Sequence, residues 1–256
     1  MRRSTPLAIT ATAITLPFPC QTYYYSPDGE ALYCSSMDGV LKIEFRPLRS
    51  TLIPGSNALG ALSLAIAAHQ GNLVISGARK QGGREERGIF ELNPLTGESR
   101  MLALNDKPET ANWAESGWHD LAVSPDGKKA AAMRQKLLEV IDLTDGSVGA
   151  LSPDLELGTW SPDGKWLAAL VWKKGHTVLM DAATLTPQRI LRMSDADWSP
   201  DSPYLLGVKT SFLCGPYAGT FEATNIDTGK AVTIKSSNCK VNRATSDWVS
   251  SKIVPE

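Results

Sequence analysis

The chain has 256 residues, of which 42% are apolar and 21% charged, and its formal net charge at pH 7 is −1. A chain of this size can bury a substantial core, and no stretch approaches the roughly 18 consecutive apolar residues of a membrane helix. The near-zero charge and the lack of an extended basic patch argue against nucleic-acid binding. No composition shift marks a linker, so residues 1–256 are expected to form a single domain.

The N-terminal region contains two short β-like runs, at residues 7–10 and 13–16. The arginines at positions 2 and 3 and the apolar stretch that follows them faintly match an export signal, but this stretch is short, rich in threonine and interrupted by Pro6. The pattern therefore favours two strands over a cleaved leader.

A four-residue phrase recurs along the chain. Ser-Pro-Asp-Gly occurs at residues 26–29, 124–127 and 161–164, and a degenerate copy, Ser-Pro-Asp-Ser, occurs at 199–202. Proline presets φ, aspartate bonds its own backbone and glycine accepts positive φ, so the phrase suits a tight turn. Each copy lies between apolar or aromatic runs, which predicts a hairpin at each one.

A second turn signal follows each of these hairpins. It has the form of an apolar residue, then Asp or Asn, then often glycine, at residues 92–97, 141–146, 180–184 and 226–229. Two hairpins in succession make a unit of four strands, and self-similar four-stranded units indicate the blades of a β-propeller.

The number of blades follows from the residue before each serine. This residue is Tyr25, Val123, Trp160 or Trp198, and weaker matches occur at Ala68 and Trp248. Six first strands predict an all-β fold, a six-bladed propeller of four-stranded antiparallel blades, with the N-terminal runs completing the sixth blade beside the C-terminal strands. Five full blades followed by a tail is the alternative.

The repeats are similar to the WD40-like repeat of TolB-type six-bladed propellers. The resemblance extends from Gln21 to about Ser251 and includes three intact motifs, although no Trp-Asp dipeptide ends the third strands as in true WD40 repeats. Membership of this family implies a binding surface more often than chemistry.

Propeller geometry predicts which face of the molecule binds a partner. With the strands of a blade labelled A to D from the axis outward, the A–B and C–D turns are short, whereas the B–C and D–A connections are long. The long segments are residues 77–88, 104–118, 211–219 and 235–243. Since loops presented by a rigid scaffold commonly carry function, the B–C and D–A face is the predicted binding face.

Aromatic and arginine side chains dominate interface energetics, and seven candidate binding residues follow from this rule and the loop positions. They are Arg84, Arg87, Trp113, Trp118, His119, Asp120 and Tyr217. The structural alternative is that Trp118 fills a gap between blades and that residues 84–87 form a solvated hairpin tip.

His119 and Asp120 enter the innermost strand of the third blade, near the axis. A histidine beside a carboxylate has acid–base chemistry, but a polar contact between blades is the alternative. No hydrolase elbow, phosphate-binding loop, dinucleotide fingerprint or Cys-x-x-Cys pair occurs. We therefore assign no catalytic residue, no cofactor and no metal site.

Tyr25, Trp160, Trp198 and Trp248 share one repeat position, where large side chains can fill the wedge between blades. A carbohydrate-stacking stripe is the alternative. Val123 and Ala68 occupy the same position and favour packing.

The four cysteines separate into two pairs. Cys20 and Cys34 flank the first hairpin, while Cys214 and Cys239 fall in two loops on one face of the fifth blade. Disulfides Cys20–Cys34 and Cys214–Cys239 favour a periplasmic or extracellular location, and four reduced cysteines are the alternative.

The sequence thus predicts a non-enzymatic propeller that binds a protein or peptide through its B–C and D–A face, with no nucleic-acid partner and no integral membrane segment. The alternative is a small-molecule or glycan hydrolase or lyase that uses an axial pocket near His119 and Asp120.

Overall fold

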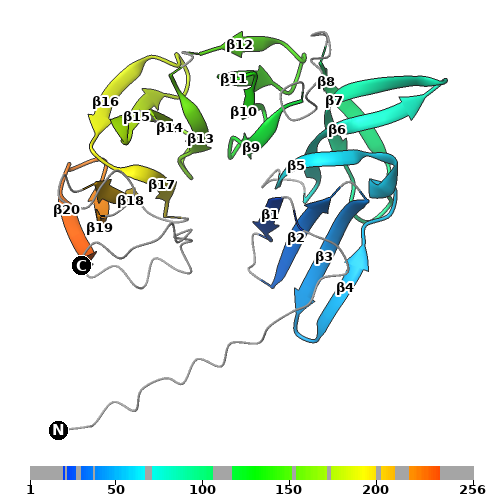
Figure 1. Cartoon of the computed structure of the whole chain (residues 1–256), viewed down its shortest axis with the longest axis horizontal. Helices are drawn as coiled ribbons and strands as arrows, with labels where there is room; N and C mark the ends of the chain where they lie inside the picture. Colours follow the sequence, from blue (N-terminus) through cyan, green and yellow to red (C-terminus); the bar gives the residue numbers. More distant parts are fainter. Residues whose placement is uncertain are drawn as a thin grey trace, which may run out of the picture.

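The computed structural model of the chain describes residues 20–236, except 21, 27–29, 37, 67–70, 106–116, 152–153, 172–173, 200–202 and 211–218. These residues form consecutive four-stranded antiparallel sheets arranged around a common centre (Figure 1). None of the described helices is both long and apolar enough to cross a bilayer.

The strands follow one another as simple meanders, so that each sheet is continuous in sequence. The first sheet contains β1 (Thr22–Tyr25), β2 (Ala31–Ser36), β3 (Gly39–Phe45) and β4 (Leu48–Leu52). After the short 3-10 helix η1 (Ser56–Ala58), the second contains β5 (Gly60–Ile66), β6 (Leu73–Gln81), β7 (Arg84–Leu92) and β8 (Ser99–Leu104). The third contains β9 (His119–Val123), β10 (Lys129–Arg134), β11 (Leu137–Asp142) and β12 (Val148–Ala150). The fourth contains β13 (Glu156–Trp160), β14 (Trp166–Val171), β15 (His176–Asp181) and β16 (Pro187–Leu191). The fifth contains β17 (Ser194–Trp198), β18 (Tyr204–Thr210), β19 (Gly219–Asn225) and β20 (Ala231–Ser236).

The prediction of six blades is wrong, because the described residues form five four-stranded blades. The fifth blade already has its fourth strand at β20, which ends at Ser236. The supposed sixth start at Trp248 is followed by no Ser-Pro-Asp-Gly phrase, so its assignment rested on a weak match alone. It lies outside the described residues, as do the runs at 7–10 and 13–16.

At residues 124–127 and 161–164, where the structure describes it in full, the repeated phrase forms the predicted turn between first and second strands. In the third blade, the Ser124 hydroxyl donates to the Asp126 carboxylate at 2.7 Å and accepts the Lys129 N–H at 2.9 Å, while Gly127 has φ of 71°. Burial raises the pKa of Asp126, but the hydrogen bonds from Ser124 and from the Lys128 N–H outweigh it, so the pKa lies below its ordinary value. The phrase is therefore a self-contained turn.

The fourth blade repeats this arrangement. The Ser161 hydroxyl donates to Asp163 at 2.7 Å and accepts the Trp166 N–H at 2.9 Å. The predicted second turns are also present, since Asn93, Asp142, Asp181 and Asn225 each accept backbone N–H groups from residues two or three positions later. The turn prediction is confirmed at these positions.

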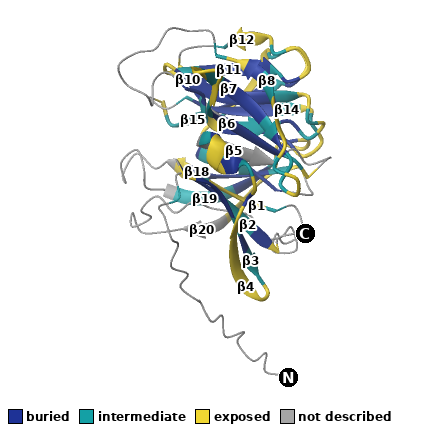
Figure 2. Ribbon diagram, turned by 90° about the vertical axis from the view of Figure 1, so that its right-hand side faces the viewer, coloured by how far each residue is buried: buried dark blue, intermediate teal, exposed yellow. Residues whose placement is uncertain are grey.

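Apolar side chains pack between neighbouring blades. Ile53 packs with Phe90 between the first and second blades, and Val74 with Ile141 between the second and third. Leu138 and Leu167, then Leu179 and Leu205, belong to the clusters at the next two junctions. Figure 2 shows β4 exposed along its length, whereas β2 and β3 carry the buried residues of the first blade.

Two tryptophans make the same contact at successive junctions. The Trp160 indole N–H donates to the Ala122 carbonyl of the preceding blade at 3.1 Å, and the Trp198 indole N–H donates to the Thr159 carbonyl at 3.2 Å. Both side chains are buried, which confirms their predicted core role.

Tyr25 occupies the same repeat position but is 48% exposed, so its predicted core role is wrong. It pairs with Leu32 and contacts Phe45, on the face of the first sheet that turns away from the second. In the first blade this face has no preceding blade among the described residues to pack against. The fourth member of the series, Trp248, lies outside them.

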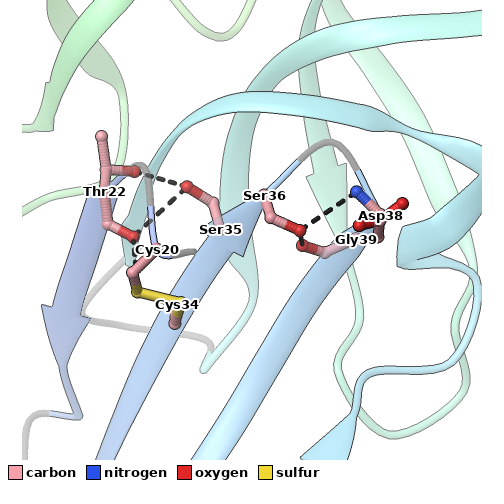
Figure 3. The surroundings of a disulfide bond; sticks show 7 residues. All are labelled: Cys20, Thr22, Cys34, Ser35, Ser36, Asp38 and Gly39. Carbon is pink, nitrogen blue, oxygen red and sulfur yellow. Dashed lines mark hydrogen bonds between the residues drawn. A yellow bond between two sulfur atoms is a disulfide. The ribbon is translucent and has the colours of Figure 1, made fainter. Parts of the chain in front are cut away.

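The structure contains the predicted Cys20–Cys34 disulfide, with a Cα–Cα distance of 5.4 Å (Figure 3). Beside it, the hydroxyls of Thr22 and Ser35 are hydrogen-bonded at 2.6 Å, across the pairing of β1 with β2. The bridge thus ties the segment before the innermost strand to the second strand. Residues 214 and 239 lie outside the described part.

Candidate functional site

The start of each innermost strand lies beside the end of the second strand. In the third blade, His119 pairs with Met133 near the end of β10, while Val123 pairs with Ala130 near its beginning. The B–C turn and the entry to the innermost strand therefore lie on one face. We call this the B–C face.

A long hairpin extends from this face. Strands β6 and β7 each have nine residues and pair without interruption from Leu73 opposite Leu92 to Gln81 opposite Arg84. The pairing of β5 reaches only Ala78, and that of β8 reaches only Gly88. Residues 79–86 therefore project beyond the neighbouring strands, and together with Arg87, whose carbonyl accepts the Asn105 N–H at 2.8 Å, they form an arm (Figure 1).

The arm corrects the prediction that residues 77–88 form a loop, because most of them belong to strands. The turn consists of Gly82 and Gly83, with φ of 58° and 79°. Positive φ at both central residues defines the hairpin turn whose twist matches that of the flanking strands. Opposite charges facing each other across the strands support the same pairing.

Two ion pairs form along the arm. Arg79 Nε lies 3.0 Å from Glu86 Oε2, and the Arg79 guanidinium lies 5.2 Å from the centre of the buried Phe90 ring. Arg87 Nη2 lies 2.6 Å from Glu85 Oε1. Both arm carboxylates thus have arginine partners, and the arm is anchored to the core through Phe90.

Two cations remain at the arm tip. Lys80 faces Glu85 across the strands, but the Glu85 carboxylate pairs with Arg87 instead. Arg84 is exposed beside the turn. Within the described part of the chain, neither Lys80 nor Arg84 forms an ion pair, so the tip carries two uncompensated positive charges.

A buried polar network lies below the B–C face, between the second and third blades. Arg134 and Glu139 are 2% and 1% exposed, and Arg134 Nε lies 2.8 Å from Glu139 Oε2. The Trp118 indole N–H also donates to Glu139 Oε2, at 2.7 Å, and the Arg134 guanidinium stacks 4.3 Å from the centre of the Trp118 ring.

The same network reaches both neighbouring strands. Arg134 donates to the Asn105 side-chain oxygen just after β8, and the Ser76 hydroxyl of β6 donates to the Trp118 carbonyl. The network therefore fixes Asn105 and Trp118, which flank residues 106–116. It also holds the residue that immediately precedes His119.

Acidic residues occur where the innermost strands begin. Asp120 and Asp195 hold equivalent repeat positions, both at β-bulges, with φ of 51° and 47°. Glu156 begins β13, and none of the five innermost strands contains lysine or arginine. The ionised side chains of the innermost strands are therefore all acidic, whereas the B–C turns carry the exposed Lys136 and Lys174.

His119 contacts its sequence neighbour, with Nδ1 2.8 Å from Asp120 Oδ2, and both side chains are about 40% exposed to solvent. Acid–base catalysis also needs a substrate held within hydrogen-bond reach of the histidine. Within the described residues, no group of three or more His, Cys, Asp or Glu side chains could hold a metal ion.

Tyr24 of β1 also borders the centre of the ring. The pKa of Tyr24 lies above its ordinary value, mainly through desolvation by nearby protein and secondarily through the negative charge of Asp197 on β17, although 43% of the residue is exposed to solvent.

The structure separates the seven predicted binding residues. Arg84 lies at the arm tip and Arg87 further down the arm, paired with Glu85, while His119 and Asp120 lie at the entry to β9. Trp118 is only 1% exposed and belongs to the core, as the structural alternative expected. Trp113 and Tyr217 lie outside the described residues.

Sequence reasoning missed Lys80 and the Arg134–Glu139 pair. A signal for the pair was present, because Glu139 interrupts the apolar run at residues 137–141 and Arg134 ends the run at 130–133. A charge within a buried strand needs a buried partner. Lys80 could be identified only from the strand register.

No protein-family model matches the chain, and no curated protein matches it. Solved structures match at probability 1.00. A protein assigned as TolB from Agrobacterium tumefaciens matches with a TM-score of 0.60 and 19% identity over 85% of this chain and 81% of that one.

Two further structures match with a TM-score of 0.52. The Cps50 (Swd1) β-propeller domain from Myceliophteria thermophila is 11% identical over 77% of this chain and 70% of that one. A protein assigned as a 6-phosphogluconolactonase from Bacteroides uniformis is 17% identical over 88% and 73%. The fold is thus a TolB-like β-propeller.

Proposed function

We propose that this chain is a non-enzymatic binding propeller that engages a protein or peptide partner through its B–C face, here taken to include the D–A connections. The observation that carries the proposal is the β6–β7 arm. It extends beyond its neighbouring strands and ends in Lys80 and Arg84, two cations that form no ion pair with any other described residue. A rigid projecting hairpin with unmatched charge is suited to contact another molecule.

The opposite face offers less for recognition. Its turns are short, and their carboxylates accept hydrogen bonds from their own turns, as in Asp126, Asp142 and Asp181. The polar groups of these turns are thus already used within the fold, which favours the B–C face as the binding face.

The fold by itself does not choose a function, because the matched structures carry unrelated names, one of them an enzyme name. The proposal therefore rests on the arm. The Cys20–Cys34 disulfide supports a periplasmic or extracellular location, since disulfides persist in oxidising compartments.

Replacing Arg84 by alanine is expected to weaken capture of the native partner by about fivefold, because a rim charge that meets a complementary group contributes to association. The matched control is Lys230→Ala. Lys230 is exposed in the turn between β19 and β20 on the opposite face.

Capture is measured as the amount of a single co-purified protein, identified and quantified by mass spectrometry, from extracts of the native organism. Thermal unfolding of both variants is expected to match that of the unaltered chain. Equal capture by the Arg84 variant and the unaltered chain would refute the proposal, as would an equal loss in the Lys230 variant.

A further inference from the structure

We infer that the tip of the β6–β7 arm recognises carboxylate side chains of an acidic peptide segment on the partner protein. This inference rests on the proposed function and specifies the partner's chemistry at that face. The site consists of the N–H groups of Gly82 and Gly83, flanked by Lys80 and Arg84.

The turn provides open backbone donors. Within the described part of the molecule, the N–H groups of Gly82 and Gly83 donate to no acceptor. A Cβ atom added at either glycine would meet nothing within 4 Å, so the turn is sterically free on its outer side. An incoming oxygen atom can therefore approach the backbone without displacing a side chain.

The cations flank these donors from opposite faces of the hairpin. Arg84 lies on the same face as Arg79 and Glu86, whereas Lys80 lies on the face of Glu85 and Arg87. Because both glutamates pair with arginines, neither neutralises the tip cations. A carboxylate at the turn would gain charge-assisted hydrogen bonds.

The arm holds this arrangement in place before a ligand arrives. The uninterrupted β6–β7 pairing and the stacking of Arg79 on Phe90 fix the hairpin relative to the core. A preorganised site loses less conformational entropy on binding than a flexible loop does. The tip therefore suits recognition of a short segment.

The acidic entries of the innermost strands favour an acidic protein segment on the arm over a long polyanion across the ring. Nucleic acids bind through many phosphate contacts, each of which needs a cation. On this face, the centre of the ring carries Asp120, Glu156 and Asp195 at the starts of the innermost strands. A continuous polyanion would be repelled there, whereas a folded partner can place its acidic segment on the arm alone.

The test is a titration of the isotope-labelled full chain with a capped peptide of alternating glutamate and threonine, followed by amide NMR. The amide signals of Gly82 and Gly83 are expected to shift, and a matched peptide with glutamine in place of glutamate is expected to leave them unchanged. Affinity is expected to fall about tenfold in the Lys80→Gln, Arg84→Gln double variant and to stay unchanged in Lys230→Gln. It is also expected to fall as salt rises, because exposed charge pairs are screened.

Three outcomes would overturn the inference. They are equal shifts with the glutamine peptide, shifts confined to residues away from the tip, and tighter binding at the tip by a single-stranded oligonucleotide than by the acidic peptide. If the peptide fails but partner capture depends on Arg84, the binding face stands and the acidic partner is rejected. If the peptide binds at the tip but capture is independent of Arg84, the inference stands and the proposed function fails.

Discussion

Replacing Glu139 by alanine is expected to lower the free energy of unfolding by about 3–5 kcal/mol, because it leaves the buried Arg134 guanidinium without its counter-ion. Arg134 is only 2% exposed and cannot recover the lost interaction from water. The change also removes the acceptor of the Trp118 indole N–H. The measurement is chemical unfolding followed by tryptophan fluorescence and circular dichroism.

The size of this effect matters because domains are typically stable by only about 5–15 kcal/mol. The control is the double variant Arg134→Met, Glu139→Leu, which removes both charges and fills the space with apolar atoms. It is expected to be considerably more stable than Glu139→Ala. A loss below about 1 kcal/mol for Glu139→Ala would show that the pair is not buried as described.

Replacing Trp160 by alanine is expected to cost about 3–5 kcal/mol, because the indole fills the junction between the third and fourth blades. The same change at Tyr25, which holds the equivalent repeat position, is expected to cost about 1 kcal/mol or less, because that side chain is largely exposed. Each value comes from denaturant unfolding of the single variant.

Trp198→Ala provides an internal reference, since Trp198 makes the same indole-to-carbonyl contact as Trp160. It is expected to resemble Trp160→Ala in its cost. Equal losses at Tyr25 and Trp160 would contradict the placement of Tyr25 on a face that no other described blade covers.

The propeller fold could be predicted because its turns depend on local chemistry. The Ser124 and Asp126 side chains satisfy the backbone of their own turn, so the phrase specifies the same hairpin wherever it occurs. The Cys20–Cys34 disulfide could likewise be predicted from the position of its cysteines on either side of one hairpin.

The number of blades could not be predicted in the same way. A resemblance such as that of Ser246–Ser250 to the start of β17 shows similar residues, but a blade exists only where four strands pair. Pairing depends on the residues of all four strands, so a match over one short segment does not establish a blade. Counting candidate first strands therefore gave six blades, one more than the five that the described residues form.

The sequence-based prediction and the structure-based proposal name the same face, but they differ in the residues that carry the proposal. Arg84 was found from its residue type, whereas Lys80 needed the strand register, which places it opposite Glu85, and the ion pair that Glu85 forms with Arg87 instead. Trp118 was named as a binding candidate because it adjoins a long connection, with filling of a gap between blades as the alternative, and its indole reaches Glu139 in the core. Such contacts join residues far apart in the chain, and single-sequence patterns do not report them.

The central claim is that a protein partner binds the B–C face, and the most direct test is hydrogen–deuterium exchange of the chain with and without its captured partner. The claim predicts slower exchange at residues 80–85 on the arm in the complex, with unchanged exchange in the turns at 124–129 and 161–166 on the opposite face. Protection confined to those opposite turns, with the arm unchanged, would contradict it.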